Sequence, residues 1–228
     1  MICWRRVAAC TGKELRELRL MTAVFALLGA AAVTCGIALR QATFFTPSAA
    51  LLDLLVVAAL HAGLLAERQG ADVGKATRRH LLSFPLQPLE VVAGKGFAFL
   101  LAQVTLVLVG IAAYAGAARF LTDIRPEPAG LAFAACRILL FSIPCWSTEL
   151  AVVSWPRVGP ATVLSLIAAY ALGLVLLPPL RGMFNIAHLL LLWIDDLPLL
   201  GPGLAAALLA WAGIMTTAWA VTVRPVEE

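Results

Sequence analysis

Residues 67–95 read ERQGADVGKATRRHLLSFPLQPLEVVAGK, and long apolar runs lie on both sides of them. Five of these residues are cationic, namely Arg68, Lys75, Arg78, Arg79 and Lys95. Because cations are costly in hydrocarbon, we expect this stretch to be the longest part of the chain outside lipid. A basic segment between two apolar runs offers a surface that a soluble partner protein could bind.

The composition indicates an integral membrane protein. Of the 228 residues, 62% are hydrophobic and only 13% are charged, and the mean hydropathy is +0.94. One soluble core of this length could not bury so much apolar side chain. An apolar run of about 17–25 residues crosses a bilayer as a helix, so the sequence predicts an all-α membrane fold with six spans. Their approximate ranges are 20–39, 49–66, 96–118, 129–148, 159–179 and 203–223.

The distribution of cations predicts the orientation of these spans. If the N-terminus is cytosolic, twelve Lys and Arg residues fall in cytosolic segments, four fall outside, and Arg137 lies within a span. The positive-inside rule then places both termini in the cytosol of a multi-pass protein, and we expect the bacterial inner (plasma) membrane. Since the cations follow the topology and do not gather on one folded face, the net charge of +4 does not indicate a nucleic-acid partner.

Residues 1–19 mix apolar and charged side chains in the pattern of an amphipathic helix. Trp4, Val7 and Leu18 are among the apolar positions, and the cations include Arg16 and Arg19. We expect an interfacial helix on the cytosolic leaflet, bent at Gly12, before a transmembrane domain over residues 20–228. A basic flank that only sets the topology is the alternative. The first span is long and follows a polar lead, so we expect it to stay in the mature chain.

Within residues 67–95, the segment Gly70 to Ala76 resembles an incomplete phosphate-binding loop. The P-loop requires four residues between its glycines and a Ser or Thr directly after the Lys, to bind Mg²⁺. Here three residues separate Gly70 from Gly74, and Ala76 follows Lys75. We therefore expect this chain to bind no cofactor, so that any ATP chemistry requires another polypeptide.

The second half of the stretch predicts a helix, a tight elbow and another helix. Pro85 ends the first helix, and Pro88 can occupy the first turn of the next one, because neither needs a backbone N–H there. The second helix would then run into the third span.

This pattern resembles the ABC-2 type permeases, the membrane subunits of type V ABC exporters. The resemblance rests on Leu81, Leu82, Pro85, Leu86, Glu90 and Lys95. Upstream, residues 74–78 read GKATR where the family often has an acidic residue. The six spans, the N-terminal amphipathic helix and the short chain agree with the family over nearly the full length.

The resemblance implies a dimeric permease that binds a cytosolic ABC ATPase, with ATP and Mg on that partner. Residues expected to couple the ATPase are Arg78, Arg79, Leu81, Leu82, Pro85, Leu86 and Glu90. The cargo would be an amphipathic or lipid-like molecule moved outward through a pathway between two permeases. The size also resembles the haem-exporter subunits of cytochrome c maturation, and no signature selects between these cargoes.

Residues 180–202 are apolar in part but too short to span. The run from Asn185 to Ile194 would extend about 15 Å as a helix, half of a hydrocarbon core. We expect a re-entrant hairpin from the outer face, close to a pathway or a dimer seam, because irregular backbone at membrane depth must be buried in protein or line water. Type V exporters have a similar hairpin before the last span, and His188 lies in this one.

The candidate pathway or intramembrane polar residues are Asp53, His61, Arg137 and His188. Arginine stays charged, so Arg137 needs a carboxylate, carbonyls, water or a lipid phosphate. Three interpretations remain open, namely a structural Asp53–Arg137 pair, a cargo-facing Arg137, and snorkelling to the interface. His61 can be a hydrogen-bonded helix contact, a ligand or a proton relay.

Two other classes of function differ from transport. A membrane enzyme would need a nucleophile–His pair, paired Asp residues or a metal-binding His cluster, and His61, His80 and His188 are too scattered to indicate one. We therefore expect no metal site and no enzyme activity of this chain alone. A membrane scaffold or assembly factor without transport remains as an alternative.

Overall fold

The computed structural model describes residues 2–40, 47–71, 88–122, 125–153 and 209–217. Four long helices make up most of this part: α1 (Trp4–Arg40), α2 (Pro47–Ala71), α4 (Pro88–Leu121) and α5 (Pro128–Val153). Each is long and apolar enough to cross a membrane, which confirms an all-helical fold of the membrane type. The fifth span, most of the sixth and the hairpin at 180–202 lie outside the described residues.

Proline marks the start of three of these helices, because α2, α4 and α5 begin at Pro47, Pro88 and Pro128. The first helical position suits proline, which has no N–H to donate and a backbone angle already set for a helix. The expectation that Pro88 opens a helix running into the third span is confirmed, since α4 is continuous from Pro88 to Leu121. The segment that precedes it, with the predicted elbow, is outside the described residues.

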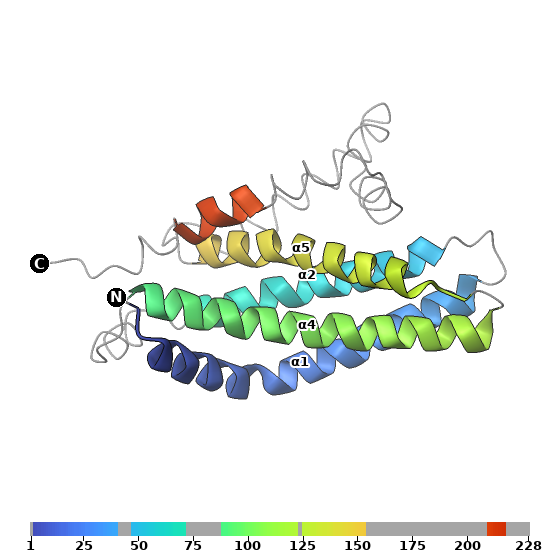
Figure 1. The fold of residues 1–228 in the computed structure, drawn as a ribbon, viewed down its shortest axis with the longest axis horizontal. Coiled ribbons are helices and arrows are strands. Elements are labelled where there is room, and N and C mark those ends of the chain that lie inside the picture. The colour runs from blue at the N-terminus through green and yellow to red at the C-terminus, as the bar shows by residue number, and fades with distance from the viewer. Residues whose placement is uncertain (1, 41–46, 72–87, 123–124, 154–208, 218–228) are drawn as a thin grey trace, which may run out of the picture.

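Consecutive helices run in opposite directions, α1 beside α4 and α2 beside α5 (Figure 1). The start of α1 and α4 therefore lies at the same end of the bundle as the end of α2 and α5. We call this the polar end, and it is the end that we expect in the cytosol from the positive-inside rule. The opposite end is called the far end.

Helix α1 is longer than the predicted first span. It is one helix from Trp4 to Arg40, so the boundary predicted at residue 19 is not a helix end. Its first turns run at an angle to the rest of the helix in Figure 1. Contacts between α1 and α4 support this angle. The backbone N–H of Cys3 donates a hydrogen bond to Glu90, and Lys95 donates one to Glu14. Along α1 the rise is about 15 Å from Trp4 to Glu14, but their partners Phe97 and Lys95 differ by only about 3 Å along α4, so α1 crosses α4 obliquely here.

Two apolar clusters form the core. The cluster nearer the far end includes Val33, Leu54, Leu106 and Ile138, one residue from each long helix. The cluster nearer the polar end includes Leu18, Leu65, Phe99 and Trp146, again one from each. Every helix therefore contributes to both clusters, which fixes the four helices relative to one another along their length.

Glycine allows the closest approach between helices in the far cluster. A Cβ built on Gly110 of α4 would overlap the side chain of Leu54 of α2, and one built on Gly36 of α1 would lie 2.6 Å from Oδ2 of Asp53. Small residues at such contacts increase van der Waals packing between membrane helices. Helix α5 continues through Pro144 in its interior.

Candidate functional site

The exposed faces of the helices change character near the polar end. On α1 the exposed residues include Lys13, Arg16 and Arg19, and from Leu20, which is 74% exposed, they become apolar. On α4 Leu89 is exposed in the first turn, and exposed apolar residues then recur from Phe97 as far as Arg119, a rise of about 33 Å and close to one hydrocarbon thickness. The boundary of a bilayer's hydrocarbon core therefore fits at the level of Leu20 and Phe97.

A buried ion pair lies next to this level. Nζ of Lys95 in α4 is 2.8 Å from Oε1 of Glu14 in α1, and the two side chains are 1% and 4% exposed. Charges so completely removed from water require good geometry and additional hydrogen bonds. The pair therefore fixes the register of α1 on α4.

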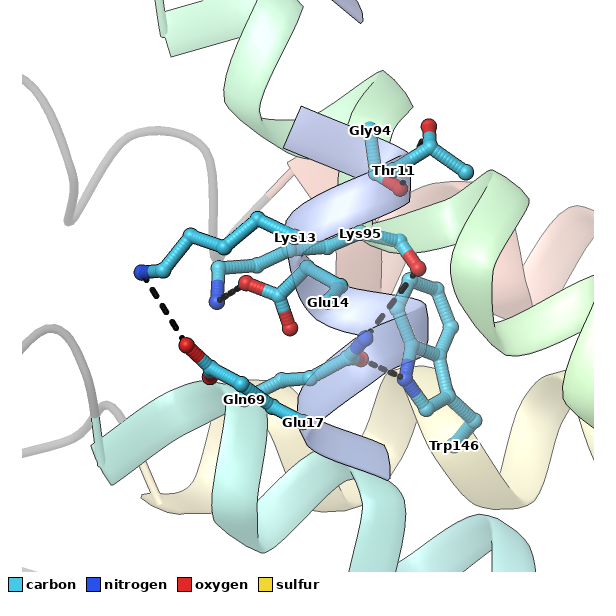
Figure 2. Close-up of polar contacts among 8 residues, drawn as sticks. All are labelled: Thr11, Lys13, Glu14, Glu17, Gln69, Gly94, Lys95 and Trp146. Carbon is cyan, nitrogen blue, oxygen red and sulfur yellow. Dashed lines mark hydrogen bonds and ion pairs between the residues drawn. The ribbon is translucent and has the colours of Figure 1, made fainter. Parts of the chain in front are cut away.

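Two further helices join at Lys95. Its backbone carbonyl accepts a hydrogen bond from Nε2 of Gln69 in α2, at 3.2 Å, and Oε1 of Gln69 accepts one from Nε1 of Trp146 in α5, at 2.8 Å. The Trp146 ring stacks on Phe99 of α4, with 4.7 Å between ring centroids. Figure 2 shows Glu14, Gln69, Lys95 and Trp146 converging from four helices. We call these four residues the polar cluster.

The start of α1 is also attached to the start of α4. Oε1 of Glu90 accepts a hydrogen bond from the backbone N–H of Cys3 at 2.8 Å, and Oε2 lies 3.8 Å from the guanidinium of Arg6. One turn further, the hydroxyl of Thr11 donates to the carbonyl of Gly94 at 3.2 Å (Figure 2). Gly94 is needed for this approach, because a Cβ there would lie 2.7 Å from Sγ of Cys10.

Glu90 is the one predicted coupling residue that the described part of the chain includes. Its side chain is 1% exposed, and the contacts given above are with its own chain. The geometry thus gives Glu90 the role of holding the N-terminal turns of α1 in place. The other predicted coupling residues, Arg78, Arg79, Leu81, Leu82, Pro85 and Leu86, are outside the described residues, as is His188.

His61 lies deeper in the bundle. Its Nδ1 is 2.6 Å from Oε1 of Gln103 on α4, and Nε2 of that glutamine donates to the carbonyl of Ala58 at 2.6 Å. An amide oxygen only accepts, so Nδ1 is assigned the proton; Nε2 of His61 then has no hydrogen-bond partner among the described residues. This is the geometry of a helix contact between α2 and α4.

Asp53 of α2 and Arg137 of α5 both lie in the described part of the chain. Asp53 lies against Gly36 at the α1–α2 contact. The guanidinium of Arg137, a buried residue, lies 4.0 Å from the ring centroid of Phe133 in the same helix, a cation–π contact. The Asp53–Arg137 pair and the two alternative interpretations of Arg137 stay predictions.

Sequence reasoning did not identify Glu14, Gln69 and Trp146 as a site. A signal for Glu14 existed, because it falls at helical spacing with Val7, Thr11 and Leu18 and so shares their inward face. A carboxylate on that face needs a buried partner. No comparable pattern identifies the Gln69–Trp146 bond, which joins residues far apart in the sequence.

A scan against protein-family models gave no match for this chain, and a search of curated proteins found no similar sequence.

Proposed function

We propose that this chain is the membrane-spanning permease subunit of an ATP-binding-cassette exporter. It would move an amphipathic or lipid-like substrate outward, using ATP hydrolysed by a separate cytosolic ATPase. The observation that carries the proposal is the polar cluster, which joins all four long helices through Gln69 and Lys95, near the two ends of the basic stretch 67–95.

The polar cluster supports a mechanical role for that end of the bundle. Helix α4 begins at Pro88, within the predicted coupling segment 67–95, and its first two turns are bonded to α1 through Glu90, Gly94 and Lys95. Gln69 and Trp146 extend the connection to α2 and α5. A displacement applied before Pro88 would therefore move four helices as a rigid body instead of bending one of them.

The energy source follows from the sequence. The segment from Gly70 to Ala76 departs from the P-loop in its spacing and at the Mg²⁺-binding position, so ATP and Mg are assigned to the partner subunit. Two permease copies and two ATPases would form the working unit, with a pathway between the permeases. In this arrangement both termini of the chain are cytosolic.

The test is purification of the full chain from its native host in mild detergent. We expect an ATP-hydrolysing subunit in equal copy number, released by the double substitution Arg78→Glu/Arg79→Glu. Arg119→Glu, at an exposed position at the far end of α4, is the matched control and should leave the subunit bound. A chain that purifies alone and keeps its activity would contradict an exporter and favour a scaffold.

A second experiment separates docking from the intramolecular role of Glu90. Glu90→Ala removes the acceptor for the Cys3 N–H and the carboxylate near Arg6. We expect the ATPase to remain bound while trypsin cleaves after Arg5 and Arg6 faster than in the unmodified protein. Release of the ATPase with unchanged cleavage would instead indicate direct contact by Glu90.

A further inference from the structure

The exposed face of the first turns of α1 carries a surplus of positive charge. The two carboxylates of this segment are engaged, Glu14 with Lys95 and Glu17 with Lys13. Arg5, Arg16 and Arg19 are exposed, and none of them forms an ion pair with a residue of the described part of the chain. We call these three arginines the cationic face.

Exposed aromatic and aliphatic side chains border this cationic face. Trp4 is 65% exposed and its ring contacts that of Phe97, also exposed, with 6.4 Å between centroids. Leu20 directly follows Arg19 and is more exposed still. Tryptophan beside cations at the limit of an apolar surface is typical of the membrane–water interface.

The level of the cationic face matches that of lipid phosphates. Arg16 and Arg19 precede Leu20 by about one turn of helix or less, so both are within about 6 Å of the hydrocarbon boundary along the axis. Arg5 is far from Leu20 in sequence, but the oblique crossing of α1 over α4 brings its neighbour Trp4 to Phe97. The backbone positions of all three arginines thus lie near the level of this boundary.

We infer that Arg5, Arg16 and Arg19 form a binding surface for the headgroups of anionic phospholipids in the leaflet at the polar end. Guanidinium suits phosphate because it offers paired N–H donors in a planar fork. A soluble acidic protein fits less well, because the same surface exposes Trp4, Leu20 and Phe97 and continues into the apolar faces of α1 and α4. This inference does not depend on transport or on an ATPase.

The experiment uses the full chain reconstituted in phosphatidylcholine vesicles, with and without phosphatidylglycerol, followed by native mass spectrometry of retained lipid. We expect preferential retention of phosphatidylglycerol. One cation near an anionic surface contributes about 1 kcal/mol, roughly a fivefold change in partitioning. Arg5→Gln/Arg16→Gln/Arg19→Gln should therefore reduce the preference at least about tenfold, and more in low salt than in high salt.

Two variants control for charge and folding. Arg68→Gln/Arg119→Gln/Arg125→Gln removes the same charge from other exposed positions and should keep the preference. Replacing the three arginines of the cationic face with lysine should keep most of it. Equal losses in both glutamine variants, no preference in the unmodified protein, or loss of a co-purifying protein with unchanged lipid retention would each overturn the inference.

Discussion

The polar end and the far half of the bundle are held together by different chemistry. At the polar end, a buried ion pair and a chain of hydrogen bonds connect α1, α2, α4 and α5. In the far half, aliphatic side chains meet at glycines, as Leu54 does at Gly110. The difference matches the surroundings, because apolar burial drives helix association little where lipid tails are equally apolar.

Each kind of contact has a different weakness. A helix contact packed closely against glycine loses stability when a methyl group is added. A buried ion pair loses stability when one of its two partners is removed. At the polar end the pair also lies where hydrocarbon gives way to headgroups, so protein must exclude water from it. The following substitutions test this contrast.

The largest effect is expected for Lys95→Met, which leaves the carboxylate of Glu14 buried without its cation. Loss of one partner of a buried pair costs about 3–5 kcal/mol of unfolding free energy. The measurement is unfolding in detergent micelles, followed by circular dichroism. Adding Glu14→Leu should restore most of the loss, because two apolar groups can pack where two charges did.

Lys13→Met is the matched control for that experiment. It breaks the exposed Lys13–Glu17 pair, whose atoms are 3.7 Å apart, and should change the unfolding free energy by about 0.5 kcal/mol or less. If Lys95→Met has an equally small effect, the polar end is not held by its ion pair.

In the far half, Gly110→Ala should cost about 1–3 kcal/mol, because the added methyl overlaps the buried Leu54. Combining it with Leu54→Ala should cost less than the sum of the two single changes. Gly116→Ala is the control, since a Cβ there meets no described atom within 4 Å. If the losses of unfolding free energy from Gly110→Ala and Leu54→Ala simply add, the added methyl group does not act through a clash with Leu54.

Trp146→Phe tests the hydrogen-bonded part of the polar cluster separately from its apolar part. Phenylalanine can still stack on Phe99, but Oε1 of Gln69 loses its donor, and we expect a loss of about 1–2 kcal/mol. Trp211→Phe removes a similar bond, to Thr148 at an exposed site, and should cost about 0.5 kcal/mol or less. Equal effects of the two variants would argue that burial does not strengthen the Gln69 bond.

The smallest effect is expected from Gln103→Leu, between the two regions. Hydrogen bonds between membrane helices contribute about 0.6 kcal/mol on average, so we expect a loss of that order, with at most about 1.7 kcal/mol. Thr105→Val removes only a bond to the same helix, to the carbonyl of Leu101, and should be nearly neutral. A loss several times larger than about 0.6 kcal/mol would show that the His61–Gln103 contact stabilises the bundle more than the contact at Gly110 does.

The helices themselves were predictable from the sequence. Apolar runs of spanning length, together with Pro47, Pro88 and Pro128, locate α2, α4 and α5 to within a few residues at most ends. The continuity of α1 across residue 19 was less predictable, although the charged amphipathic segment and the span after it have no proline between them. Helical propensity continues through such a junction.

What the sequence determined by itself is the class of fold and the chemistry present, because hydrophobicity and cation placement are properties of the chain alone. It identified Glu90 and Lys95 as noteworthy but assigned Glu90 to an external partner. Only the tertiary structure decided that Glu90 holds Cys3 and that Lys95 meets Glu14. The physical reason is that a buried charge is defined by what packs around it, and here those neighbours come from a helix more than eighty positions away in the sequence.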